Sequence, residues 1–170
     1  MRASNRNGSL DFNNITGDVS AETSFARLTA RSVNGTFTAE NRNGAIEGRS
    51  IQGAVRASTS FDAVTLEQVS GGVDVTNRNG AVTVREIVGA NPACKPVVVR
   101  NSFGPIRVSL PASSNYDLMA NTSSARIHSD FPLSVSGNLD PKSISGKIGS
   151  GGCQLDLSNR NGSIDLLRTP

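Results

Sequence analysis

The sequence lacks the residues on which most catalytic sites, metal sites and membrane spans depend. It has no Trp, one Tyr, one His and two Cys in 170 residues, and aromatic residues make up 4%. One His and two Cys are too few for the usual zinc sites and for mechanisms that need two histidines. No stretch approaches the ~18 consecutive apolar residues of a membrane helix. We therefore expect no metal, no cofactor and no membrane span in this segment.

Charge is also sparse and nearly balanced. Charged residues make up 18%, and 17 basic against 14 acidic residues leave a net charge of +3, which does not indicate a nucleic-acid partner. A β-helical glycosidase or lyase needs carboxylates gathered in one place. The acidic residues here are scattered: Asp11, Glu22, Glu40, Glu47, Asp62 and Asp74. With His128 as the only histidine, we expect a protein without catalytic activity.

The chain nevertheless has the composition of a folded domain. Hydrophobic residues make up 36% and there are 17 Gly, so a globular chain of strands and turns is expected. A length of 170 residues predicts one domain, residues 1–170. All seven prolines lie at position 92 or later. This distribution predicts a regular ladder in the first half and insertions at about 90–96 and 130–152 in the second.

The clearest feature is an internal repeat of 18 residues in two alternating types. Thr-Ser-Phe occurs at 23–25 and 59–61, halfway between copies of Asn-Arg-Asn-Gly that are 36 residues apart. The unit continues from Asn5 to Gly89 without insertion or deletion. The copies of Asn-Arg-Asn-Gly lie at 5–8, 41–44, 77–80 and 159–162.

Apolar residues recur at fixed positions of the unit, numbered from the first Asn or Thr. Positions 6, 8, 11, 15 and 17 predict two short strands per unit and form the expected core. Position 8 varies in size, and Gly48 there is expected to leave room for a bulky neighbouring ring. Position 6 predicts one buried column: Leu10, Leu28, Ile46, Val64, Val82 and Ile106.

An 18-residue unit cannot bury its own apolar face, so successive units must stack as a solenoid. A β-sandwich of hairpins is the rival, because Asn-Gly is also a strong hairpin signal. The constant unit length decides against it, since stacked turns need equal lengths. We predict an all-β, single-stranded parallel β-helix: a flattened two-sheet solenoid of about eight turns, right-handed. The seventh unit is expected from Thr122 and the eighth from Asn159.

The segments Asn43-Gly44-Ala45-Ile46 and Val69-Ser70-Gly71-Gly72-Val73 carry a resemblance to a known family. Nearly the whole chain resembles a bacterial adhesin-like β-strand-repeat family, a domain of unknown function in envelope-associated proteins. The resemblance implies a structural or adhesin-like module of the cell envelope, periplasmic or extracellular, with any signal or anchor outside this chain. The alternative is a carbohydrate-binding or carbohydrate-active β-helix protein.

Two columns at the start of the unit are candidate binding residues. Position 2 holds Arg6, Arg42 and Arg78, about 9.6 Å apart on alternate turns, which predicts a basic stripe for an anionic ligand such as an envelope glycan. Position 3 of the intervening units holds Phe25, Phe61 and Phe103. We expect these rings to fold over a corner of the core, because the chain has few other aromatics, rather than to stack on sugars.

Cys94 and Cys153 are the candidate disulfide, and both fall in the insertions. In an unbroken ladder they would lie two turns apart, about 9.6 Å, which exceeds the ~7 Å limit for a bridge. Freedom in the insertions could close that distance.

Two further expectations concern the backbone. The Asn-Gly pairs, such as Asn43-Gly44, are expected to form turns in which Asn accepts left-handed backbone angles and its amide bonds to the adjacent turn. Only four residues precede Asn5, so the N-terminal solenoid edge is expected to stay uncovered and to mediate self-association.

Overall fold

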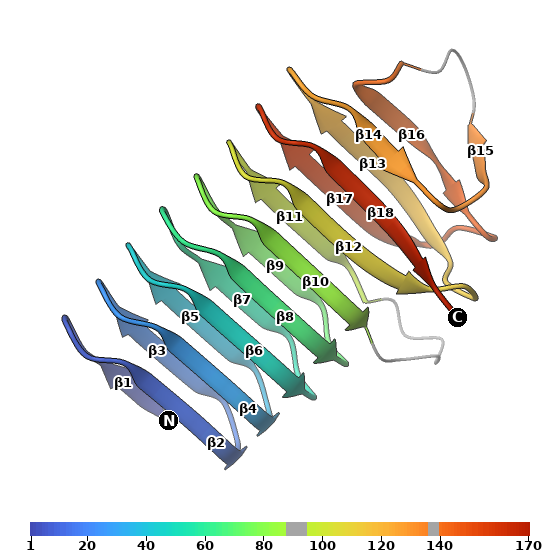
Figure 1. The fold of residues 1–170 in the computed structure, drawn as a ribbon. Helices are drawn as coiled ribbons and strands as arrows, with labels where there is room; N and C mark the ends of the chain where they lie inside the picture. Colours follow the sequence, from blue (N-terminus) through green and yellow to red (C-terminus); the bar gives the residue numbers. More distant parts are fainter. Residues whose placement is uncertain (88–94, 136–139) are drawn as a thin grey trace.

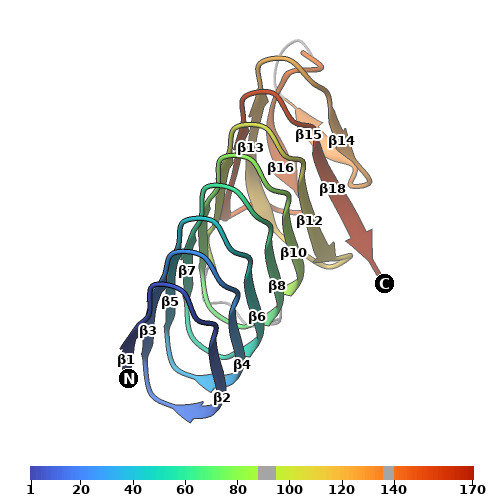
Figure 2. The same ribbon diagram turned by 60° about the vertical axis from the view of Figure 1, so that its left-hand side comes forward.

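The computed structural model describes residues 1–87, 95–135 and 140–170, and it is built from two facing β-sheets (Figures 1 and 2). We call them sheet A and sheet B. Sheet A contains β1 (Arg2–Ser4), β3 (Val19–Thr23), β5 (Phe37–Asn41), β7 (Val55–Ser58), β9 (Val73–Thr76), β11 (Val97–Asn101), β13 (Tyr116–Thr122), β15 (Leu133–Val135), β16 (Ser143–Ile148) and β17 (Cys153–Asn159). Sheet B contains β2 (Leu10–Thr16), β4 (Leu28–Asn34), β6 (Ile46–Ile51), β8 (Val64–Val69), β10 (Val82–Ile87), β12 (Ile106–Pro111), β14 (Ile127–Ser129) and β18 (Ile164–Thr169).

Each turn of the coil, here called a rung, passes from a strand of sheet A through a corner to a strand of sheet B. Strands of successive rungs pair in parallel with an offset of 18 residues, so Leu28 lies opposite Ile46 and Ile46 opposite Val64. The register survives the first insertion, because Val82 lies opposite Ile106. The predicted two-sheet solenoid is therefore confirmed, and the hand of the coil stays a prediction.

The core is the predicted one. The position-6 column is fully buried from Leu28 to Ile106, while Leu10 at the first rung is half-buried. Gly48 makes room as expected: a Cβ there would lie 2.9 Å from Leu66 Cδ2 and 3.6 Å from the ring of Phe37. Volume is thus traded between neighbouring rungs, which keeps the narrow core filled.

A column of left-handed residues explains why the inward positions are 6, 8 and 11 rather than every second one. Asn14, Ser32, Ser50, Gln68 and Glu86, all at position 10, have φ between 51° and 56°. A single left-handed residue reverses the alternation of a strand, so position 11 turns inward again. The left-handed angles predicted at the Asn-Gly corners are not found there, so that prediction was wrong: among the described residues, no Asn of those pairs has a positive φ.

Glycine is needed at the corners for a different reason, which is close approach between rungs. A Cβ on Gly44 would overlap the carbonyl oxygen of Ala26, and one on Gly80 would overlap that of Asp62. Only a residue without a side chain lets these backbones lie at strand spacing.

The last rung lies out of sequence order. β17 is inserted between β11 and β13, and β18 between β12 and β14 (Figure 1). Leu155 lies opposite Val97 on one side and Leu118 on the other. The prediction that the units stack in sequence order was wrong here, because the unit beginning at Asn159 precedes the unit beginning at Thr122 in space.

The second insertion explains this exchange and a departure from all-parallel pairing. β16 pairs antiparallel with β13, and β15 pairs antiparallel with β16. Because β16 occupies the outer edge of β13, only its inner edge is open to β17. Gly149, Gly151 and Gly152, with φ of 58°, 76° and 121°, turn the chain from β16 to β17 past the start of β13.

We predict that Ile46→Asp unfolds the protein, because the carboxylate would enter a fully buried column that offers no compensating charge. Thermal denaturation followed by circular dichroism measures the effect. Ser58→Asp, which places the same carboxylate on an exposed position of β7, is the control and should leave Tm nearly unchanged. An Ile46→Asp variant with the parent's Tm would refute the register.

Candidate functional site at the corners

Buried polar side chains hold each corner from inside. They occupy position 1, and each donates a hydrogen bond to a carbonyl of the neighbouring rung: Thr59 Oγ1 to Gly44 at 3.1 Å, Asn77 Nδ2 to Asp62 at 2.9 Å. Thr and Asn alternate in this ladder along most of its length. The buried members are Thr23, Asn41, Thr59, Asn77, Asn101, Asn159 and Thr122.

An Asn at position 1 also closes its own turn. The Asn41 amide donates to the carbonyl of Ala45 at 3.4 Å and accepts from the N–H of Gly44 at 3.2 Å. This role of the first Asn was not predicted from the sequence, although its presence in all four copies was an available signal. The bond predicted from the second Asn to the adjacent turn is confirmed: Asn43 Nδ2 donates to Ser24 O at 3.0 Å.

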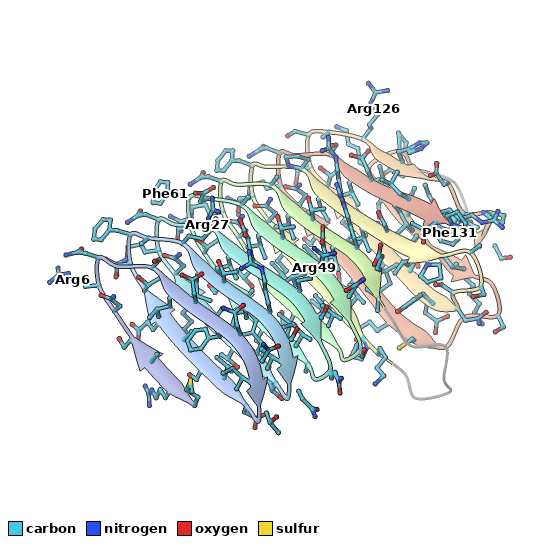
Figure 3. All side chains as sticks on the ribbon, turned by 60° about the horizontal axis from the view of Figure 1, so that its bottom comes forward. Arg6, Arg27, Arg49, Phe61, Arg126 and Phe131 are labelled. Carbon is cyan, nitrogen blue, oxygen red and sulfur yellow. The ribbon has the colours of Figure 1, made fainter. Side chains whose placement is uncertain are left out.

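The rings at position 3 face solvent. Phe25, Phe61 and Phe103 are 57%, 59% and 56% exposed. The expectation that they fold onto the core was wrong, because the inner side of the corner is already filled by the position-1 ladder. Figure 3 shows Phe61 projecting from the edge of the coil between Arg6 and Arg126.

The arginines at position 2 lie on the same edge. Arg6, Arg42, Arg78 and Arg160 are exposed. The ion pairs found among the described residues involve other arginines: Arg27 with Glu47, Arg49 with Glu67, Arg100 with Asp74, and Arg107 with Asp165. The arginines of the predicted basic stripe therefore lie in a row, and their charges are not neutralised by these ion pairs.

Arginine and phenylalanine alternate along this edge, one per rung. We call the row the corner ridge: Arg6, Phe25, Arg42, Phe61, Arg78, Phe103 and Arg160. At about 4.8 Å per rung it spans about 29 Å. Arg160 belongs to it only because the last rung is inserted beside the rung of Phe103.

The other surface features of the described residues are weaker candidates for a functional site. A shallow groove on sheet B is lined by Thr29, Arg31, Glu47, Arg49, Thr65 and Glu67, and its charges of both signs largely pair. His128 pairs with Asp130 at 2.9 Å. In residues 1–87, 95–135 and 140–170 no group of three His, Cys, Asp or Glu side chains is placed to hold a metal ion. The same residues contain no helix able to cross a membrane.

The candidate disulfide is partly placed. Cys153 is buried at the start of β17, opposite Tyr116, whose hydroxyl donates to Lys95 O at 3.5 Å; burial raises the pKa of that tyrosine. β17 lies directly beside β11, so the separation by two rungs that opposed the bridge does not exist. Cys94 lies outside the described residues, and the bridge stays a prediction.

Comparison with known proteins assigns the family. A family model described as Toastrack DUF4097 matches residues 2–167. The chain belongs to the Toastrack DUF4097 family. This is a domain of unknown function with a β-solenoid fold, which confirms the coarser part of the resemblance seen in the repeats. No curated protein and no solved structure matches this Toastrack domain.

We predict that Phe61→Ala lowers the free energy of unfolding by less than about 1 kcal/mol, because the ring is mostly exposed. Phe37→Ala, which removes a fully buried ring, should cost about 3 to 5 kcal/mol. Urea denaturation of both variants gives the comparison. Equal losses would show that the corner rings contribute to the core.

We also predict that Cys94 and Cys153 form a disulfide in this Toastrack domain. Thiol titration of the unfolded, unreduced protein should then find no free thiol, and titration after reduction should find both. Two free thiols before reduction in protein purified from an oxidising compartment would reject the bridge.

Proposed function

We propose that this Toastrack domain is a non-catalytic, adhesin-like module of the bacterial cell envelope, and that it binds carbohydrate along the corner ridge. The observation that supports this most is the exposure of Phe25, Phe61 and Phe103, each more than half exposed and all on one edge. A ring that is more than half exposed adds little to the stability of the domain, and exposed apolar groups gathered in one place mark binding surfaces.

The ridge has the physical properties that a sugar-binding surface needs. The apolar face of a pyranose ring packs against the face of an aromatic ring, while its hydroxyl and charged groups require polar partners beside that ring. Because each corner is held by buried hydrogen bonds, the rings are positioned before binding, and little ordering cost is added on association. Rings in a straight row suit a linear chain better than a single sugar.

The envelope location and the absence of catalysis belong to the same proposal. A pair of cysteines in a predicted bridge suits an oxidising compartment outside the cytoplasm. The described carboxylates near the ridge do not converge as the acid and base of a glycosidase must, which favours binding over hydrolysis. Self-association through the open edge at β1 and β2 remains a separate prediction.

The test is binding of the full chain to linear polysaccharides, neutral and acidic, by affinity electrophoresis. We expect the triple variant Phe25→Ala, Phe61→Ala, Phe103→Ala to lose retention, because the stacking surface is removed. The triple variant Arg6→Ser, Arg42→Ser, Arg78→Ser should lose retention on acidic polysaccharides at low salt, because the charge attraction is removed.

Matched controls separate the ridge from general surface effects. Met119→Ala removes an apolar side chain that is 52% exposed on sheet A, away from the corners. The triple variant Arg31→Ser, Arg56→Ser, Arg85→Ser removes the same charge from exposed positions on the sheet faces. Both controls should bind as the parent does. Absence of binding to every polysaccharide, or full binding by the phenylalanine triple variant, would refute the proposal.

A further inference from the structure

Resting on the proposed function, the ridge geometry points to one class of ligand. We propose that the corner ridge binds an extended acidic polysaccharide in which a uronic acid alternates with a neutral sugar, one sugar residue per rung. Each phenylalanine packs on a neutral ring and each arginine binds the carboxylate of the next residue.

The spacing of the corner ridge is close to the repeat of an extended polysaccharide. Successive members of the ridge advance along the coil axis by one strand spacing, about 4.8 Å, with the arginines at position 2 and the phenylalanines in the neighbouring column at position 3; members of the same kind are about 9.6 Å apart. One pyranose residue in an extended, β-linked chain advances the polymer by close to one strand spacing. Along the coil axis, the ridge and a disaccharide-repeat polymer therefore advance by similar distances per member, which a folded glycan or a short peptide loop would not do.

The arginine and phenylalanine side chains of the ridge suit different groups of a ligand. A guanidinium group binds a carboxylate through two parallel hydrogen bonds, and Arg42 and Arg78 are exposed and outside the ion pairs found among the described residues. Phe61 between them offers an apolar face with no charge to match. A polymer charged at every residue would place a carboxylate against that ring, and a neutral polymer would leave the arginines unused.

The inserted rung continues the alternation of Arg and Phe beyond Phe103. In sequence order the rung of Phe103 would be followed by Thr122-Ser123-Ser124, which has neither Arg nor Phe at the corner. In space it is followed by Asn159-Arg160-Asn161-Gly162, so the alternation continues without a gap to Arg160. The topology thus completes a ridge of seven successive members.

The neighbouring acids do not cancel this arrangement. Within the first four positions of the eight repeat units, Asp62 is the one acidic residue against four arginines, so the corners keep an excess of positive charge. Glu22 and Glu40 precede their corners on the exposed face of sheet A. An anionic lipid surface would also attract the arginines, but a fluid bilayer has no repeat that requires strict alternation, so the glycan is favoured.

The experiment compares four probes with the full chain under one ionic condition. They are hyaluronan, in which glucuronate alternates with N-acetylglucosamine; polygalacturonate, which is charged at every residue; a neutral linear β-glucan; and vesicles containing anionic lipid. We expect oligosaccharides of hyaluronan to bind at least about tenfold more tightly than length-matched oligosaccharides of the other two.

A variant that changes the pattern while adding charge makes the test sharper. Ser60→Arg combined with Phe61→Asn converts one corner to the other type and places arginines on three successive rungs. We expect it to bind hyaluronan about tenfold more weakly than the parent and polygalacturonate more tightly. Attraction by net charge alone would strengthen both. Ser58→Arg adds the same charge on the exposed face of β7 and should not reverse the preference.

The outcomes separate this inference from the proposed function. Equal binding of hyaluronan and polygalacturonate, or a preference for the neutral glucan, overturns the alternating ligand and leaves carbohydrate binding standing. Binding to vesicles without binding to any polysaccharide overturns both. A variant that binds both acidic polymers more tightly reduces the ridge to a general cation surface and overturns the inference.

Discussion

Hydrogen bonding between successive parallel rungs is the constraint on which the rest of this structure depends. The N–H of Leu28 bonds to Ala45 O, that of Ile46 to Ala63 O and that of Val64 to Ala81 O, at 2.9, 3.0 and 2.9 Å. Bonds repeated in this way favour turns of equal length, so from β2 to β10 each residue lies above its counterpart 18 positions away. The core columns, the corner glycines and the left-handed column at position 10 all follow from this stacking. The backbone conformation and side chains of one rung must pack against the same conformation and side chains in the next.

The same constraint makes the corners polar inside and available outside. Backbone carbonyls turn inward where the chain leaves one sheet for the other, and a buried carbonyl must be bonded. Asn77 and Asn159 meet this need with amides that reach the neighbouring rung. Since these side chains fill the inner side of the corner, position 3 is left in solvent. Three phenylalanines are exposed there although the core has few aromatic residues. Because the rungs stack, an exposed position that recurs along the chain becomes a row of side chains on one edge.

The inserted rung extends this logic. If the two unit types must alternate in space, the Ser-containing units beginning at Asn101 and Thr122 cannot be neighbours, and the unit beginning at Asn159 fits between them. Thr122 Oγ1 donates to Gly162 O and Asn159 Nδ2 to Gly104 O, so the position-1 ladder follows the spatial order rather than the sequence order. The break in alternation between 101 and 122 was visible in the sequence. Its consequence, the insertion of the last rung between two earlier ones, depended on the antiparallel strand β16, which closes the outer edge of β13.

The sequence by itself determined the period, the two-sheet coil, the buried columns and the row of arginines. These are properties of stacking, and a repeat of constant length states them directly, as the column from Leu28 to Ile106 shows. Only the tertiary structure decided which way Phe61 faces, because this depends on what already occupies the inner side of its corner. It also decided the place of Cys153–Thr169, because a strand with this register can pair through either edge, as β17 pairs with β11 on one side and β13 on the other. The order of the last rungs was set by which edge remained open, and an edge exists only once the preceding strands have paired.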